Sequence, residues 1–208
     1  MLAITFGDEE ARERALDAIR AIHRRVHGTL PAACGRFPAG TPYDAEDPAL
    51  LLWVHATLVD SILLAYERLV APLDNAERDQ YCADSVEVAI ALGAGEDDVP
   101  RCWSALRAYL DREYASGSIA VSGQARDLAA ALLSPASHRA AAPLTALVTL
   151  LAAGLLPAEI RRGYGFAWSA RRQRAFGMTL RVLRLTRRLL PRFMAWWPQA
   201  RRWSVSAR

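Results

Sequence analysis

The segment DPALLLWVHATLVDSILLAYERLV, residues 47–70, predicts a long buried helix and so decides the fold class. Asp47 has the short acidic side chain of an N-cap. Pro48 suits the first helical position, because the N–H that it lacks would be unpaired there. Apolar residues then dominate as far as Val70, and Pro72 ends the pattern. We therefore expect one helix across the whole segment.

The same helical signals continue on both sides of this segment. A first helix is expected from Asp8 to Gly28, because acids follow Asp8 and a proline follows Gly28. Sustained period-two alternation and Asn-Gly or Asp-Gly turns are absent from the sequence, so we expect no strand. The predicted class is all-α, with residues 1–208 forming a single domain. Further helices are expected at about residues 75–92, 99–114, 124–132, 140–153 and 169–190, with a short amphipathic segment at 196–203.

The composition is that of a globular chain in a reducing compartment. The chain has 208 residues, of which 52% are hydrophobic, enough for a core that needs neither disulfides nor a structural metal. Its three cysteines are odd in number and far apart, so no disulfide framework or zinc knuckle is predicted. The N-terminus has no basic segment of the signal-peptide kind. We expect a cytoplasmic protein.

Charge is divided unevenly along the chain. Residues 139–208 hold 14 arginines against one acid, whereas residues 1–138 hold 12 arginines against 21 acids. Such asymmetry fits either an anionic partner or complementarity between the two halves, and we favour complementarity. No zinc finger, RNP pattern or recognition turn accompanies the basic half, so nucleic acid is not an expected partner.

Two stretches have features that suit a membrane. Residues 140–158 are apolar for about the length of a bilayer core, but alanine and polar residues reduce their hydrophobicity, so we expect a central packed helix. In the basic tail, residues 192–208, tryptophans are interleaved with arginines. The tail is therefore expected either to contact a membrane surface peripherally or to dock on the protein's own core.

Histidine is rare in this chain, with four residues in all. In the first expected helix, His23 continues the apolar stripe that begins at Leu16, so it should face the core. Arg20 and His27 lie about one turn before and after it, which would make a single polar ridge. A bound ligand would relieve the ridge of a burial cost of about 1–3 kcal/mol for each unpaired polar group.

Other interpretations of these histidines remain open. His23 could be a core histidine bonded to a backbone carbonyl, or a metal ligand together with His27, although the first helix supplies no complete ligand set. His55 lies on the inward stripe of the segment 47–70, and neighbouring polar residues are placed where a pocket wall could use them. His138 lies in a turn and is expected to be exposed. The polar neighbours are Thr57, Asp60 and Ser61.

Hydrolase and nucleotide-binding motifs are absent from the sequence. There is no Gly-x-Ser-x-Gly elbow, no phosphate loop and no Rossmann glycine fingerprint. The expected helical pattern also lacks the strands on which those motifs depend.

Four phrases of the sequence together resemble one family. They are ITFG at residues 4–7, AIHRRVHG at 21–28, YDAEDP at 43–48 and LWVHATLVDS at 52–61. These resemble the MpaB-type oxygenase domain, which is related to the latex-clearing rubber oxygenases. The resemblance spans nearly the whole chain and is most specific in the two phrases that carry histidines.

The resemblance implies an all-helical, globin-like bundle around a haem b pocket. The family's proximal iron ligand is a histidine in an Arg-x-x-His context, which Arg20 and His23 fit. His23 is therefore expected to ligate the iron, while Arg20, His27 and His55 line or support the pocket. An apolar small molecule and dioxygen are the implied reactants of a haem-dependent oxygenase.

One departure from the family qualifies these expectations. The family domain usually begins with additional helices that carry an Arg and Thr motif on the distal oxygen side, and this chain starts after them. Either the start of the sequence is truncated, or this member is a shortened form whose haem pocket is open on one side. Missing helices should also leave apolar surface uncovered, which favours a homo-oligomer or instability. The alternative function is a non-catalytic helical module that binds a partner or a membrane surface.

Overall fold

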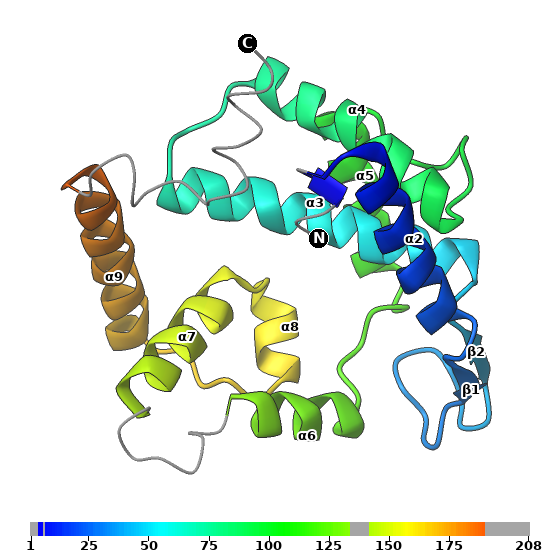
Figure 1. Ribbon diagram of the computed structural model, residues 1–208. Coiled ribbons are helices and arrows are strands. Elements are labelled where there is room, and N and C mark those ends of the chain that lie inside the picture. The colour runs from blue at the N-terminus through cyan, green and yellow to red at the C-terminus, as the bar shows by residue number, and fades with distance from the viewer. Residues whose placement is uncertain (1–3, 6, 134–141, 190–208) are drawn as a thin grey trace.

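The computed structural model describes residues 4, 5, 7–133 and 142–189. Within these residues the chain forms eight helices and one two-stranded sheet, so the predicted all-α class is confirmed in its helical content (Figure 1). The elements are α2 Glu9–His23, β1 His27–Thr29, β2 Pro42–Asp44, α3 Pro48–Leu69, α4 Asn75–Leu92, α5 Trp103–Ala115, α6 Gly123–Leu132, α7 Ala142–Leu155, α8 Ala158–Gly163 and α9 Ala170–Leu189.

Helix α3 forms where the sequence predicted it. The Asp47 carboxylate accepts a hydrogen bond from the Ala49 N–H at 2.8 Å, and Pro48 opens the helix. At the other end, Arg184 of α9 donates to the backbone carbonyls of Arg68 at 2.5 Å and Glu67 at 2.9 Å. A guanidinium is favourable there because the C-terminal end of a helix carries partial negative charge.

The core lies where α3 packs against α4 and α5. Buried side chains form two clusters, and α3 contributes to both, so this helix is the centre of the domain (Figure 1). The first cluster contains Leu51, Leu52, Val86, Ala89, Ala94 and Val99. The second contains Ala56, Val59, Leu63, Cys82, Leu106 and Leu110.

Helix α3 is also, within the described residues, the one helix long and apolar enough to cross a membrane by length and composition. The same test is met by the core helices of globular proteins. Helix α3 supplies residues to both buried clusters, but only 28% of its apolar window is buried, so its place in the core explains part of its apolar character.

Helix α4 has the bounds that the sequence predicted, residues 75–92. Asp74 and Glu77 form a capping box at its start, with each side chain accepting from the other residue's backbone N–H. Gly93 ends the helix at a φ of 110°, a left-handed conformation that glycine adopts at little cost. A Cβ at this position would lie 3.1 Å from a methyl carbon of Leu51, so packing also favours glycine.

The first helix is shorter than predicted, because α2 ends at His23 and not at Gly28. Strand β1 then pairs antiparallel with β2, which places His27 opposite Asp44 and Gly28 opposite Tyr43. A Cβ on Gly28 would lie 3.0 Å from the Tyr43 hydroxyl oxygen, so the ring crosses the strand at the glycine. The prediction of no strand was wrong here, since strands of three residues are too short to show alternation.

The remaining helices, α6 to α9, form a second group beside α3 (Figure 1). Helix α9 contacts both α7 and α3, and so connects this group to the core. Helix α7 has 14 residues, fewer than the roughly 20 needed to span a bilayer. The prediction of a central packed helix at 140–158 was wrong: Ala153 is the one buried residue of α7, and Leu144 is 64% exposed.

Three predictions concern residues outside the described part of the chain. These are the exposed turn at His138, the start of the helix expected at residue 140, and the amphipathic segment at 196–203 within the tail 192–208.

Candidate functional site

His55 of α3 lies in the wall of a cavity. It lies on α3 next to Ala56 and one turn before Val59, both buried in the core. The ring is half-buried, and burial lowers the pKa of His55 below its ordinary value of 6.5. The imidazole is therefore neutral at pH 7, the form in which a histidine nitrogen binds a metal.

Ser85 of α4 is the hydrogen-bond partner of this ring. Its Oγ lies 3.3 Å from His55 Nε2 and 2.8 Å from the backbone carbonyl oxygen of Cys82. The shorter contact is a hydrogen bond of ordinary length in which the serine hydroxyl donates, whereas the contact to His55 is long. The imidazole can therefore give up its contact with Ser85 for a ligand at small cost, because the Ser85 hydroxyl stays hydrogen-bonded to the Cys82 carbonyl.

The cavity beside His55 has a volume of about 430 Å³ and lies between residues 4–5, α2, α3 and α4. Such a volume is within the usual range for small-molecule and cofactor sites. Its walls are mainly apolar, and Tyr81 adds a phenol whose pKa is raised by burial. That hydroxyl stays protonated at neutral pH and can donate a hydrogen bond. The apolar lining consists of Ile4, Leu58, Val59, Ile62 and Val88.

Charged groups lie at one side of this cavity. Arg12 of α2 is the cation among its lining residues, and it pairs with Glu87 of α4 at 3.2 Å and with Glu9 at 3.6 Å. Asp84 is also part of the lining. The rim thus holds one guanidinium, about a quarter exposed and already paired with carboxylates, beside two acidic lining residues, Asp84 and Glu87.

The outer side of α3 next to this cavity is apolar and uncovered. Val54 is 62% exposed, and Leu58 and Ile62 are each 38% exposed. Uncovered apolar surface was expected from the sequence, and these residues of α3 provide some. Since Leu58 and Ile62 also line the cavity, the His55 site is continuous with this surface.

A second cavity lies on the opposite side of α3 and has a volume of about 520 Å³. Thr57, Asp60 and Ser61 line it, so they lie on the side of α3 away from His55 and do not share its cavity. Trp53 and Tyr114 form an edge-to-face pair in its wall, with ring centroids 5.6 Å apart. This cavity separates α3 from the segment that joins α7 to α8.

Asp60 is the ionisable group of this second cavity. Burial raises the pKa of Asp60, and the Arg107 guanidinium 3.2 Å away offsets only part of that effect. Arg107 is shared, because it also pairs with Asp111 at 3.1 Å. The side of α3 away from His55 therefore holds a carboxyl group that is costly to ionise.

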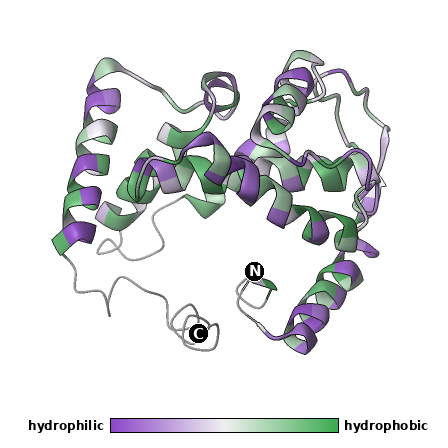
Figure 2. Ribbon diagram, turned by 90° about the horizontal axis from the view of Figure 1, so that it is seen from above, coloured by the Kyte–Doolittle hydropathy of each residue, from purple (hydrophilic) through white to green (hydrophobic). Residues whose placement is uncertain are grey.

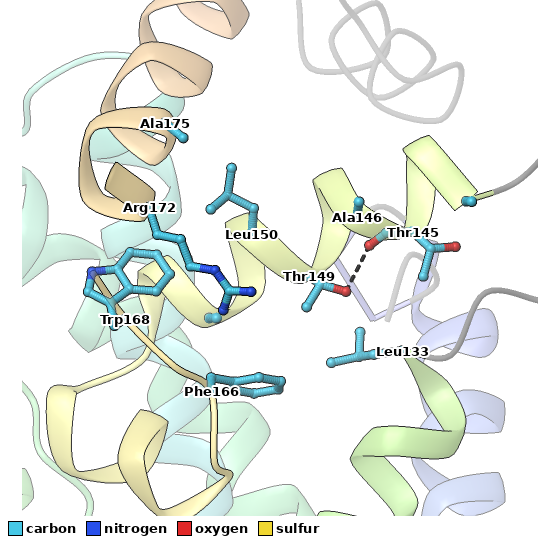
Figure 3. Close-up of a pocket in the computed structure, with 11 residues that line it drawn as sticks. Leu133, Thr145, Ala146, Thr149, Leu150, Phe166, Trp168, Arg172 and Ala175 are labelled. Atoms are coloured by element: carbon cyan, nitrogen blue, oxygen red, sulfur yellow. Dashed lines mark hydrogen bonds between the residues drawn. The ribbon is translucent and has the colours of Figure 1, made fainter. Parts of the chain in front are cut away.

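A third cavity, of about 450 Å³, lies between α7 and the segment that leads into α9 (Figure 3). Arg172 points into it between Trp168 and Thr149, while Phe166 and Leu150 form apolar walls. The Arg172 guanidinium donates to the Ala167 carbonyl at 2.6 Å. The residues that line this cavity include no histidine.

His23, the ligand expected from the resemblance, is the last residue of α2 and is half-buried. It lines neither the His55 cavity nor the other two cavities described above. The apolar stripe that was expected to carry it inward fades along α2: Leu16 is fully buried, whereas Val26 beyond the helix end is 43% exposed.

Arg20 has a structural partner. Its Nε and Nη2 donate to the backbone carbonyl of Ala91 at 2.9 and 2.6 Å, and its Nη1 pairs with Asp17 at 2.8 Å. Ala91 lies at the C-terminal end of α4, where carbonyls lack helical partners. Arg20 therefore attaches α2 to α4.

His27 is exposed in β1, opposite Asp44. The polar ridge of Arg20, His23 and His27 does not form, because α2 ends at His23 and the chain turns into the strand. In the part of the chain that is described, no group of three or more His, Cys, Asp or Glu side chains could hold a metal ion.

Sequence reasoning placed His55 on an inward face but missed the groups around it. Ser85 is an isolated serine on α4, and Arg12 is one of several arginines on α2, so neither carries a sequence signal. Their roles depend on α2 and α4 crossing the same stretch of α3, which is a tertiary arrangement.

Comparisons with known proteins identify the family of this chain. A family model for the catalytic domain of the ER-bound oxygenase mpaB/B′ and rubber oxygenase matches residues 1–188. The uncharacterised proteins Rv2237 of Mycobacterium tuberculosis and Mb2261 of Mycobacterium bovis are each 31% identical over 190 residues, covering 90% of this chain and 71% of theirs. No solved structure matches the chain significantly. The chain belongs to the family of mpaB/B′ and rubber oxygenase catalytic domains.

Proposed function

We propose that this chain is a haem b-dependent oxygenase-type oxidoreductase that acts with dioxygen on an apolar small molecule. The proposal rests on one observation: in a chain of an oxygenase family, the neutral imidazole of His55 lies in the wall of an apolar cavity. In this proposal the helices are a globin-like bundle around the haem.

The residues of the His55 cavity fit a haem group chemically. An imidazole nitrogen with a weak, exchangeable partner is a suitable axial ligand for iron. The apolar side chains from α3 and α4 suit the faces of a porphyrin, whereas Arg12 would have to exchange Glu87 or Glu9 for a propionate carboxylate. The imidazole and the apolar part of the lining therefore support the proposal, and the paired Arg12 does not add to it.

Two histidines compete for the iron in this proposal. The Arg-x-x-His context favours His23, with Arg20 and His27 near it in sequence. The cavity favours His55, and we propose His55 as the ligand, because a macrocycle needs an apolar space beside the ligating nitrogen. Arg20 then acts indirectly, by fixing α2 and so Arg12 against α4.

Bound haem would supply an iron centre at which dioxygen is activated, with the distal surroundings deciding between binding and reaction. The role of the chain's own residues is to bind and orient the substrate. Leu58, Ile62 and Val88 offer apolar surface to an apolar substrate, and the protonated Tyr81 hydroxyl can donate a hydrogen bond to an oxygen atom of a bound group.

Haemin titration of the purified chain tests this proposal. We expect a Soret band in the wild-type protein and in His27→Ala, whose exposed ring is the control. His55→Ala should lose the band or shift it to the position of free haemin, and His23→Ala should keep it. Far-UV circular dichroism of each variant checks that the fold is retained.

Two results would contradict the proposal in different ways. A Soret band that stays at the position of free haemin in the presence of the wild-type protein would remove the cofactor and favour the non-catalytic helical module. A band kept by His55→Ala and lost by His23→Ala would return the ligand to the Arg-x-x-His phrase.

A further inference from the structure

Helix α9 has an apolar row on the face turned away from the core. Met178, Val182, Leu185 and Leu189 follow one another at steps of four, three and four, so they lie on one side of the helix. Their exposed fractions are 59%, 53%, 58% and 76%. The opposite face contributes Phe176 and Leu180 to the protein interior.

Arginines flank this row. Arg174, Arg181 and Arg188 recur every seven residues along one edge of it, and Arg171 lies at its N-terminal end. Helix α9 contains no acidic residue. In Figure 2 the helix that leads into the grey C-terminal trace lies at the edge of the molecule and shows alternating hydrophilic and hydrophobic bands.

These arginines have no carboxylate partner in the part of the chain that is described. Arg172, Arg174 and Arg184 donate to backbone carbonyls, and none of the ion pairs joins α9 to an acid. All the ion pairs found stay within residues 1–138 or within residues 142–189. The expected complementarity between the acidic and basic halves of the chain is therefore not made through ion pairs among these residues.

We propose that the outer face of α9 binds the surface of an anionic phospholipid bilayer. A helix that lies in a membrane interface needs an apolar face for the acyl boundary and basic residues for the lipid phosphates. Helix α9 presents both on the side that the core leaves open. Its opposite face is fixed to the protein by Phe176 and by the bonds from Arg184 to the end of α3.

The charge of α9 favours a bilayer over pairing with a second copy of the same face. Two α9 helices in contact would bring rows of arginines together, and like charges in contact are unfavourable. The exposed apolar row also distinguishes this face from a purely electrostatic surface. This proposal does not depend on haem binding, so either proposal can fail alone.

Co-sedimentation of the full chain with lipid vesicles tests the inference. Vesicles of phosphatidylcholine alone are compared with vesicles that contain phosphatidylglycerol, at low and at high NaCl. We expect binding to the anionic vesicles that weakens with salt, because salt screens charges near a surface. The double variant Val182→Asn, Leu185→Asn should lower the partition coefficient at least tenfold, since burial of one such side chain is worth about a factor of ten.

The matched control is Leu128→Asn, Leu132→Asn on α6, where the two leucines are 60% and 74% exposed. This variant should bind as the wild type does. The variant Arg174→Gln, Arg181→Gln, Arg188→Gln should lose the preference for anionic vesicles. Because all variants keep residues 190–208, a difference between them reports on α9 and not on the basic tail.

Three outcomes would overturn the inference. The wild-type chain could fail to sediment with anionic vesicles, or it could bind neutral and anionic vesicles equally. The α9 and α6 variants could also lose binding to the same extent. Size-exclusion chromatography without lipid completes the test, because a dimer that the α9 variants dissociate would assign the apolar row to a second copy of the chain.

Discussion

The imidazole of His55 is kept neutral by its surroundings, and this has a consequence for pH dependence. Burial lowers its pKa in the folded protein below the 6.5 of the free group. Above pH 6.5 the folded and unfolded forms are both neutral, so the contribution of His55 to stability is fully present. As the pH falls below 6.5, the unfolded chain binds the proton first, and stability decreases until the folded-state pKa is passed.

We therefore predict that His55 titrates with a midpoint below 6.5 in the folded chain. The measurement is the pH dependence of its ring proton resonance in nuclear magnetic resonance spectra, assigned by comparison with His55→Gln. A midpoint for His55 at or above 6.5 would contradict the burial that we describe.

Single residues differ in how far the sequence reveals their roles. The inward place of His55 on α3 followed from helical spacing, whereas the second cavity that Thr57 and Asp60 line did not. The partner of Arg20 could not be predicted, because the Ala91 carbonyl lies 71 positions away in the chain. His27 was assigned to a helix because nothing in residues 24–27 resembles a helix terminus.

The contact between α7 and α9 depends on a glycine in one helix and an aromatic ring in the other. A Cβ on Gly154 would lie 2.4 Å from a ring carbon of Phe176, so the ring or the helix would have to move. On α9, by contrast, a Cβ on Gly177 would meet nothing within 4 Å. The two glycines are thus a matched pair for testing how these helices pack.

Gly154→Ala is expected to lower the free energy of unfolding by about 1–3 kcal/mol, as overpacking of a tight contact does. Gly177→Ala is expected to raise it by up to about 1 kcal/mol, because alanine is the better helix former. Urea denaturation followed by circular dichroism measures both values. Equal effects of the two substitutions would show that α7 and α9 do not pack as described.

Elements with strong end signals were predicted well. Helix α4 has the predicted bounds because its capping box and Gly93 are explicit in the sequence, and α3 agrees within a residue at each end. Helix α8 was missed, since its six residues are too few to show a period. Strands β1 and β2 were missed for the same reason, and α2 was then extended across β1.

The whole molecule depends on the α3, α4 and α5 core for its stability. Leu110 is fully buried in the second cluster, whereas Leu132 at the end of α6 is 74% exposed. Leu110→Ala should lower the free energy of unfolding by about 2–5 kcal/mol. Leu132→Ala should change it by less than about 0.5 kcal/mol.

Thermal and urea unfolding of these two variants would locate the core. Comparable losses from Leu110→Ala and Leu132→Ala would mean that the second group of helices is buried to a similar degree, which would contradict the exposure that we report for α6.

At the scale of the whole molecule, periodicity gave the helical class but not the arrangement. The His55 cavity is built from α2, α3 and α4, and the second cavity from α3, α5 and the segment between α7 and α8. Such spaces form between elements that are distant in sequence, so composition and spacing could not locate them. The single domain over residues 1–208 and the separate role of the tail 192–208 stay predictions.

The position of iron in crystals of the haem-reconstituted chain tests the central proposal most directly. An anomalous difference map collected at the iron absorption edge shows where the metal lies. We predict a peak within bonding distance of an imidazole nitrogen of His55, in the cavity between α3 and α4. A peak beside His23, or no iron in protein that has been saturated with haemin, would contradict it.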